Sequence, residues 1–363
     1  MPDLSVRAKP ILLFGNSCKV GEGEFLPDIA IEEALFVTNS CENPFNRNIV
    51  TCLSKERDKF INEVGSLQLD LPIKSATLDL PLYFPTLDIQ SATLMHKLNP
   101  TQFIGMSLRH FTRKLVHCKA GGYREAREIT FQPIENFFLF QNQSRIILFL
   151  TGTDTGIEYA WRERAKFKLF ESIKERNILA VGAFNFSLFD GDCAFSQVLN
   201  QKRSLYSSYL LQQNGIPTIP HIYAITQFQL QRWVTWLIQN PEVKLVTINC
   251  QFIKTQSQRI DEINIIRKLI LAVPYLQIIL EGFPFDSIFR LGPAIDNLHF
   301  TDKVPMRQAS NYKELNVDKI HRKMCIQSTE SFPSLLLKNI QRRELQLQLI
   351  RQSIFESGLK KTG

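Results

Sequence analysis

The chain has 363 residues, of which 44% are hydrophobic and 21% charged, and its net charge is +8. This length accommodates one large α/β domain with appendages or two ordinary domains, and the composition excludes a disordered chain. The seven cysteines are widely spaced without a Cys-x-x-Cys pair, which favours reduced thiols. No secretory leader and no long apolar segment is evident, so we expect a cytoplasmic protein that does not cross a membrane.

Residues 1–75 have little periodicity, and we interpret them as an N-terminal extension. From residue 76 to 303, short apolar runs alternate with amphipathic stretches, which is the rhythm of repeated βα units. The expected strands cover 80–88, 103–110, 145–151, 179–188, 218–225, 244–251, 276–283 and 298–303. Helices are expected at 91–98, 155–176, 198–213, 228–239, 257–273 and 285–291. This pattern predicts an α/β fold with a (β/α)8 barrel, and the alternative is an open parallel α/β sheet.

Two regions depart from the rhythm. Residues 111–144 form a basic insertion after the second strand, with extra strands expected at 128–134 and 137–141. Residues 304–363 form a basic C-terminal tail with eleven Lys and Arg against five Asp and Glu, and with a helix at 333–357. That helix is expected to pack on the barrel, to bind a protein partner or to rest on nucleic acid.

Polar side chains gather near the ends of the expected strands, where ligands bind in such folds. The candidates for a catalytic site are Glu281, His221, Asn249, Asn185 and Arg109. A carboxylate at the end of an apolar strand is suited to acid/base chemistry if its pKa is raised. The alternative for Glu281 is an internal ion pair with Arg109 or a hydrogen bond with Asn249, and for His221 a simple structural hydrogen bond.

No cofactor is identified, although a divalent cation is one option. Three carboxylates in expected βα loops are weak metal candidates: Asp154, Asp190 and Asp192. Because Asp and Gly are also ordinary turn formers, the same residues are explained by loop geometry alone.

Nucleic acid is a plausible partner because basic side chains cluster in the insertion and the tail. The candidate phosphate contacts are Arg113, Lys114, Lys119, Arg124, Arg127, Arg322, Lys323, Arg342 and Arg343. Solvated helix faces explain the same clusters equally well.

Residues 200–220 contain an Arg-Ser helix followed by Asn-Gly-Ile-Pro-Thr-Ile-Pro, and Phe-Asn-Phe-Ser precedes them at 184–187. This order of segments resembles an uncharacterised family of bacterial and mobile-element proteins, mainly over residues 184–220. Where that family has a tryptophan after the strand, this chain has Tyr223. The resemblance implies no established activity, only a link to mobile genetic elements, where DNA transactions are frequent.

Three functions therefore remain open from the sequence. The first is a nucleic-acid-associated barrel protein that uses its basic insertion and tail. The second is an enzyme with an acid/base or metal-assisted site at the strand ends. The third is a scaffold subunit that binds another protein through helix 333–357.

Overall fold

The computed structural model describes residues 61–119, 122–140, 145–188, 194–251, 255–317 and 325–359, without the side chains of residues 114–128, 155, 358 and 359. At its centre lie eight parallel strands: β1 (Tyr83–Pro85), β2 (Ile104–Ser107), β5 (Ile146–Phe149), β6 (Ala180–Gly182), β7 (Thr218–Ile219), β8 (Leu245–Asn249), β9 (Gln277–Glu281) and β10 (Leu298–Asp302). Each lies within one of the eight segments that the sequence predicts.

The strands form a closed barrel. Two four-stranded sheets have the orders β1-β10-β9-β8 and β2-β5-β6-β7. A parallel bridge between Thr86 and Gly105 joins them on one side, and a bridge between His221 and Thr247 joins them on the other. The prediction of a (β/α)8 barrel is therefore confirmed, and the alternative of an open sheet is wrong.

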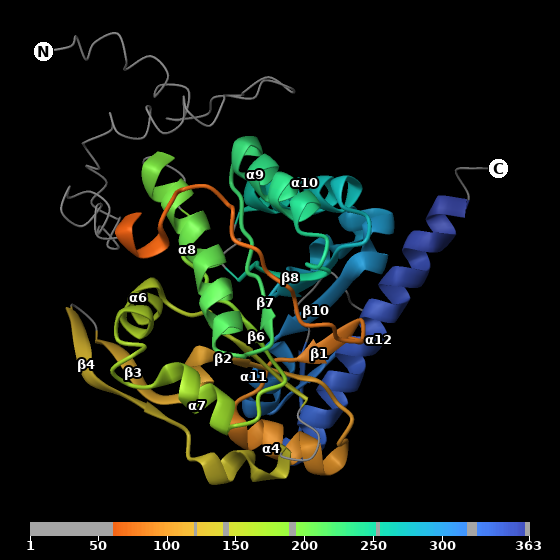
Figure 1. Cartoon of the computed structure of the whole chain (residues 1–363). Helices are drawn as coiled ribbons and strands as arrows, with labels where there is room; N and C mark the ends of the chain where they lie inside the picture. The colour runs from red at the N-terminus through yellow and green to blue at the C-terminus, as the bar shows by residue number, and fades with distance from the viewer. Residues whose placement is uncertain are drawn as a thin grey trace, which may run out of the picture.

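Helices in the connections cover the outside of the barrel (Figure 1). They are α4 (Ile89–Leu98), α5 (Leu108–Phe111), α6 (Asp154–Arg162), α7 (Leu169–Glu175), α8 (Ala194–Gln213), α9 (Gln227–Gln239), α10 (Gln256–Ala272) and the 3-10 helix η3 (Phe285–Asn297). Capping boxes at Thr226 and Thr255 fix where α9 and α10 begin, because each threonine accepts from the third helical amide. None of the described helices is long and apolar enough to cross a membrane.

The predicted helix over 155–176 is interrupted, which corrects the sequence interpretation. The chain turns between α6 and α7, and Lys168 adopts the left-handed conformation with φ 52°. Around this turn Arg164 stacks over the Trp161 ring and forms an ion pair with Glu63. Tertiary contacts of this kind override the helical periodicity of the segment.

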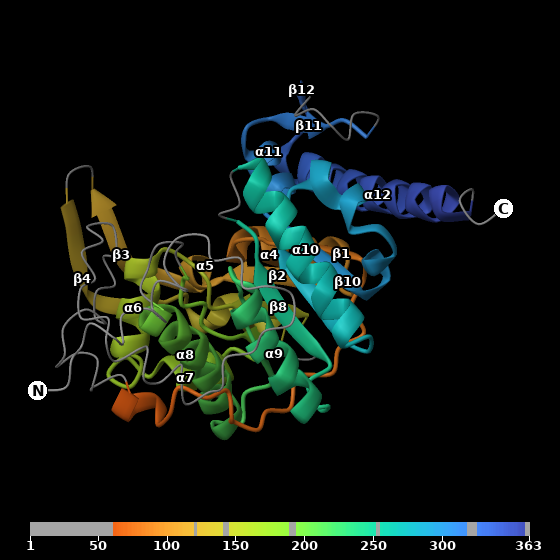
Figure 2. The same ribbon diagram turned by 90° about the horizontal axis from the view of Figure 1, so that it is seen from above.

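The insertion after β2 contains an antiparallel hairpin of β3 (Thr112–Lys119) and β4 (Gly122–Phe131), followed by the 3-10 helix η2 (Ile134–Phe140). The strand predicted at 128–134 overlaps the end of β4 at 128–131, whereas the strand predicted at 137–141 is wrong. Aromatic residues caused this error, because Phe137 and Phe140 are buried from a helical turn and not from a strand. The hairpin projects from the barrel on the side opposite the C-terminal helix (Figures 1 and 2).

The C-terminal tail is more structured than its weak periodicity indicates. It contains α11 (Val304–Ser310), an antiparallel pair of β11 (Lys313–Leu315) and β12 (Cys325–Gln327), and α12 (Phe332–Leu359). Helix α12 buries Leu335, Leu336, Ile340, Leu347 and Ile350. It packs against α11, β11, η3 and β1. Packing on the barrel, one of the three expected roles, is therefore confirmed.

The described end of the N-terminal extension closes the base of the barrel. The amide of Ala76 donates to the Thr218 carbonyl and that of Ser75 donates to the Glu242 carbonyl. Leu69 and Ile73 of the extension belong to the main hydrophobic core, and Ala76, Leu78 and Leu80, which follow it directly, pack against the apolar side chains inside the barrel. The described residues 61–75 thus contribute to the same core as the barrel.

Candidate active site

An apolar layer fills the lower part of the barrel and forms the floor of the candidate site. It consists of Leu80, Phe84, Phe103, Ile147, Phe149, Ala180, Ile219, Leu245 and Ile279. The rings of Phe84 and Phe149 stack with centroids 6.5 Å apart. This layer excludes water from below, so a polar group directly above it is desolvated.

Two glycines make room for this layer. A Cβ atom on Gly105 would lie 2.8 Å from the Thr86 hydroxyl oxygen and 3.0 Å from the Phe149 ring. A Cβ atom on Gly182 would lie 2.8 Å from the same ring. Phe149 therefore occupies space inside the barrel that only glycine on β2 and β6 leaves open.

Glu281 lies above the apolar layer, at the end of β9. Its side-chain oxygens accept hydrogen bonds of 3.1 Å from the hydroxyls of Thr151 and Thr247. The residue is only 3% exposed. Burial raises the pKa of Glu281 to about 7, against the opposing effects of the two threonine hydrogen bonds and of Lys303. The sequence interpretation offered Arg109 or Asn249 as the partner of Glu281. Among the described residues its hydrogen-bond partners are Thr151 and Thr247 instead.

Lys303 follows β10 and adds a positive charge to the same site. It is half-buried, and its Nζ donates to the Ser107 hydroxyl at 3.3 Å. Burial lowers the pKa of Lys303; nearby Glu281 raises it and Arg109 lowers it further. Among the described carboxylates, none lies within ion-pair distance of its amine. Lys303 is thus a desolvated cation without a direct counterion among the residues that the structure describes.

His110 shares the Ser107 hydroxyl with this lysine. Its Nδ1 lies 3.3 Å from Ser107 Oγ. Burial, followed by the charge of Lys303, lowers the pKa of His110 to about 4, so the ring is neutral at physiological pH. Because Ser107 accepts from Lys303, its own proton is available to the imidazole. Lys303, Ser107 and His110 therefore form a hydrogen-bonded row that links β10 to β2.

The structure also places His221 inside the barrel. His221 is in register with Thr247, and paired residues of neighbouring strands face the same way. The side chain is 1% exposed, and neither ring nitrogen has a hydrogen-bond partner among the described residues. Burial lowers the pKa of His221 to about 3, so the ring is neutral. The alternative interpretation, that His221 makes a structural hydrogen bond, therefore finds no support among the described residues.

The other predicted site residues have different surroundings. Asn249 is in register with Glu281, but its Oδ1 accepts from the Gln251 amide at 3.0 Å and so holds the turn. Asn185 lies beyond the end of β6, and its buried Oδ1 has no partner in the described segments. Arg109 is exposed on α5, and its charge acts on both Lys303 and His110.

The metal prediction finds no support in the described part of the chain. Asp190 and Asp192 lie outside the described residues. Asp154 accepts a hydrogen bond from Ser187, and burial raises the pKa of its carboxyl. In the described ranges, no group of three or more His, Cys, Asp or Glu side chains is arranged to hold a metal ion.

The predicted nucleic-acid contacts divide between the hairpin and the tail. Arg113 is exposed on β3. The structure describes the backbone but not the side chains of four further residues of the hairpin: Lys114, Lys119, Arg124 and Arg127. Arg322 and Lys323 lie outside the described residues. In α12, Arg343 forms an ion pair with Asp302, and Arg342 forms one with Glu314. These two arginines are thus engaged within the protein.

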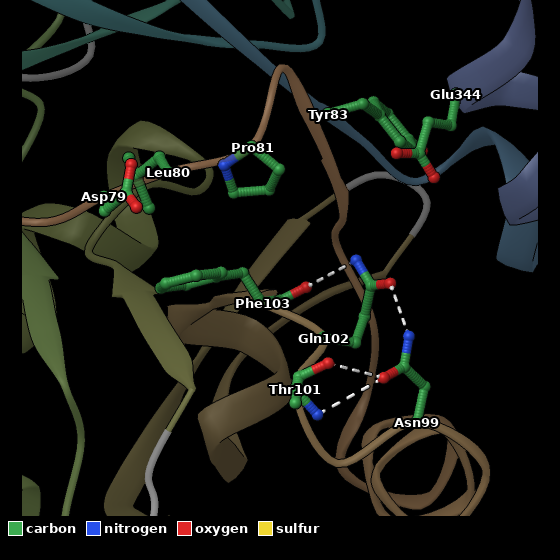
Figure 3. A pocket seen from close by; sticks show the side chains of 9 residues that line it. All are labelled: Asp79, Leu80, Pro81, Tyr83, Asn99, Thr101, Gln102, Phe103 and Glu344. Atoms are coloured by element: carbon green, nitrogen blue, oxygen red, sulfur yellow. Dashed lines mark hydrogen bonds between the residues drawn. The ribbon is translucent and has the colours of Figure 1, made fainter.

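A cavity of 320 Å³ opens at the other end of the barrel, where β1 and β2 begin (Figure 3). Its polar rim is largely self-satisfied, since Asn99 accepts from both the amide and the hydroxyl of Thr101. In barrels of this kind, the N-terminal ends of the strands serve stability, and chemistry occurs at the C-terminal ends. We therefore place the candidate active site around Glu281 and not in this cavity.

The sequence interpretation missed Lys303 and Thr151 as members of the site; it placed Ser107 and Thr247 on the polar faces of their strands without giving them a role. Lys303 lies two residues beyond Thr301 and four beyond His299, so strand periodicity alone places it on their face. Ser107 lies two residues beyond Gly105 on β2, so strand periodicity likewise places the two residues on the same face. The meeting of Thr151 with Glu281 has none, because it depends on how the closed barrel brings β5 opposite β9.

No model of a known protein family matches the chain. No curated protein matches it either. Solved structures with a similar fold include a 4-hydroxy-2-oxoglutarate aldolase/2-deydro-3-deoxyphosphogluconate aldolase (10% identity, TM-score 0.35), covering 72% of this chain and 94% of that one. Another is the YdjI aldolase from Escherichia coli K12 (9% identity, TM-score 0.39), covering 81% of this chain and 94% of that one. At these values no activity is transferred from either protein.

Proposed function

We propose that this protein is an enzyme in which Glu281 is the general acid/base for a small polar substrate bound at the C-terminal mouth of the barrel. The observation that carries this proposal is a buried carboxyl group at the strand ends with a pKa of about 7. A catalytic group is most effective when its pKa lies near the working pH, because it then both accepts and returns a proton readily.

The surroundings of Glu281 suit such a role. The hydroxyls of Thr151 and Thr247 each donate to one of its oxygens and so fix the plane of the carboxylate. The apolar layer below keeps bulk water away from the carboxyl group, so the pKa of Glu281 stays above its ordinary value. No cation lies within ion-pair distance of Glu281 among the described residues, so no salt bridge holds its pKa down.

Lys303 supplies the complementary charge. When Glu281 takes a proton from a carbon or an oxygen of the substrate, negative charge develops on the substrate. An ammonium group held by Ser107 is placed to stabilise that charge, and low solvent access strengthens the interaction. The reaction class is therefore proton transfer with stabilisation of an anionic intermediate, such as proton abstraction next to a carbonyl group.

His221 and Asn185 provide further polar contacts for a substrate. Both present buried polar atoms without partners among the described residues, and an unpaired buried polar atom costs about 1–3 kcal/mol. Active sites tolerate this cost because a bound ligand removes it. We assign both side chains to substrate binding and not to proton transfer.

The proposal is tested with neutral and anionic carbonyl compounds incubated with the full-length protein in D2O. Proton NMR follows loss of substrate and exchange of carbon-bound protons. Glu281→Gln should reduce the rate by at least about 100-fold, the usual contribution of a general acid/base. The control is Glu242→Gln, a change in a carboxylate whose side chain is 66% exposed at the opposite end of the barrel. Turnover that survives Glu281→Gln would contradict the proposal.

Nucleic-acid binding through the hairpin and the tail stays a prediction. The β3–β4 hairpin and helix α12 lie on opposite sides of the barrel (Figure 2). The link to mobile genetic elements and the scaffold role also stay predictions. None of them uses the buried groups around Glu281.

A further inference from the structure

Arg109 and Lys303 are two cations of the same site, and neither has a carboxylate partner in the described part of the chain. Arg109 leaves the barrel just after β2, and Lys303 leaves it just after β10. In the closed barrel only β1 separates these strands. The two side chains are close enough for the charge of Arg109 to lower the pKa of Lys303. Two like charges are therefore held together without an opposite charge of their own.

The nearest carboxylates are already engaged. Asp88 follows β1, the strand between β10 and β2, and its Oδ1 caps α4 by accepting from the Ser91 amide. Glu281 accepts from two threonines, and its raised pKa leaves it partly uncharged at neutral pH. His110 adds a neutral ring to the group. Asp88 keeps its negative charge when it caps the helix and acts on His110, so among these groups the charges of Arg109 and Lys303 exceed those of Asp88 and the partly ionised Glu281.

We propose that Arg109 and Lys303 bind a carboxylate or phosphate group of the substrate, so that the enzyme acts on small anionic compounds. This inference rests on the proposed function, because it names the substrate class of that same site. The anion completes the hydrogen bonds of an ammonium group whose described partner is Ser107 alone. It also supplies the counterion that the two cations lack.

The placement of the anionic group has a chemical consequence. Lys303 acts electrostatically on Glu281, so the bound anion lies beside the carboxyl that transfers the proton. The rest of a small substrate then extends across the mouth toward His221 and Asn185 on the far strands. Binding energy from the anionic group thus positions the neighbouring substrate atom that exchanges its proton with Glu281.

The experiment is titration calorimetry of the full-length protein with inorganic phosphate and, separately, with acetate, at constant ionic strength and pH 7. We expect saturable binding of at least one anion to the unmodified protein. Lys303→Gln should weaken it by about tenfold or more, the value of one charge-assisted hydrogen bond. Arg109→Gln should weaken it less, because Arg109 is exposed.

The matched control is Lys313→Gln, which removes an exposed lysine of β11 and should leave anion affinity unchanged. Tighter binding of phosphate identifies a phosphate group, and tighter binding of acetate identifies a carboxylate; either result upholds the anion site. No binding to the unmodified protein, or equal binding to Lys303→Gln, overturns it. Circular dichroism checks that each variant is folded.

Glu281→Gln separates this inference from the proposed function. That variant keeps both cations, so it should bind the anion at least as tightly as the unmodified protein while losing turnover. If Glu281→Gln retains turnover, the acid/base role fails and the anion site still stands on the Lys303 result. If turnover is lost but Lys303→Gln binds the anion normally, only the anion site fails.

Discussion

Arg343 of α12 donates two hydrogen bonds, of 2.9 and 2.8 Å, to Oδ2 of Asp302, the residue immediately before Lys303. The side chains are 12% and 7% exposed, so this is a largely buried ion pair. Oδ1 of Asp302 also accepts from the Val304 amide and from the Tyr83 hydroxyl. The C-terminal helix is thereby tied to the backbone that presents Lys303 in the site.

We predict that Arg343→Met destabilises the protein by about 3 kcal/mol, because it leaves the Asp302 carboxylate buried without a cation. Chemical denaturation followed by circular dichroism measures the loss. The double variant Arg343→Met with Asp302→Asn should lose less than the sum of the two single changes. Additive losses would mean that the two side chains do not interact.

The stability of the protein should depend on pH through Glu281. The pKa of Glu281 is raised to about 7 from 4.5, so the folded state binds more protons than the unfolded chain between these values. The contribution of this group is therefore greatest below pH 4.5 and is lost as the pH rises through 7. Glu281→Gln should match the unmodified protein in acid and be more stable by about 1–3 kcal/mol above pH 7.

Glu262 is the matched control for this effect. It is buried on α10, and burial raises its pKa to about 8. Glu262→Gln should also raise stability at high pH, by at least as much and over a range that extends above pH 8, because it too removes a buried ionisable group with a raised pKa. It should not reduce turnover, since Glu262 is outside the candidate site. Urea denaturation curves between pH 4 and 9, together with the NMR assay, distinguish the two residues.

The barrel itself was predictable because its strands are short apolar runs at regular spacing, a pattern that local physics determines. Glu281 was identifiable for the same reason, as a carboxylate at the end of such a run. Its threonine partners were not, because Thr151 and Glu281 are 130 positions apart and meet only across the barrel interior. Closure of the sheet depends on the bridges at Thr86 and His221, which leave no local signature.

The local errors have a common cause. The second strand of the insertion was assigned to residues 137–141, although Phe137 and Phe140 pack from a 3-10 helix. The segment before Arg176 has helical periodicity, but the chain breaks at Lys168 to make contacts with remote residues. In both places tertiary packing decided between alternatives that single-residue propensities leave nearly equal.

His221 should make the protein sensitive to acid. Its pKa falls from 6.5 to about 3 on burial, so the unfolded chain takes up a proton that the folded state refuses. Its contribution to stability is full above pH 6.5 and is lost as the pH falls toward 3. His221→Leu should remove this part of the acid destabilisation. Between pH 7 and pH 4 the melting temperature of the unmodified protein should fall further than that of His221→Leu. An equal fall in both proteins would contradict the assignment.

Gly105 and Gly182 should tolerate no larger side chain, because each would place a Cβ atom 2.8 Å from a neighbour inside the barrel. We predict that Gly105→Ala and Gly182→Ala each destabilise the protein by about 1–3 kcal/mol, the usual cost of overpacking a core. The control is Gly152→Ala, where the nearest atom is the flexible end of Ile157 at 3.7 Å and the change should be almost neutral. Urea denaturation of the three variants measures these differences.

Because the Phe149 ring that both glycines accommodate is part of the floor under Glu281, Gly182→Ala should also shift the pH dependence of stability that Glu281 produces, whereas Gly152→Ala should leave it unchanged.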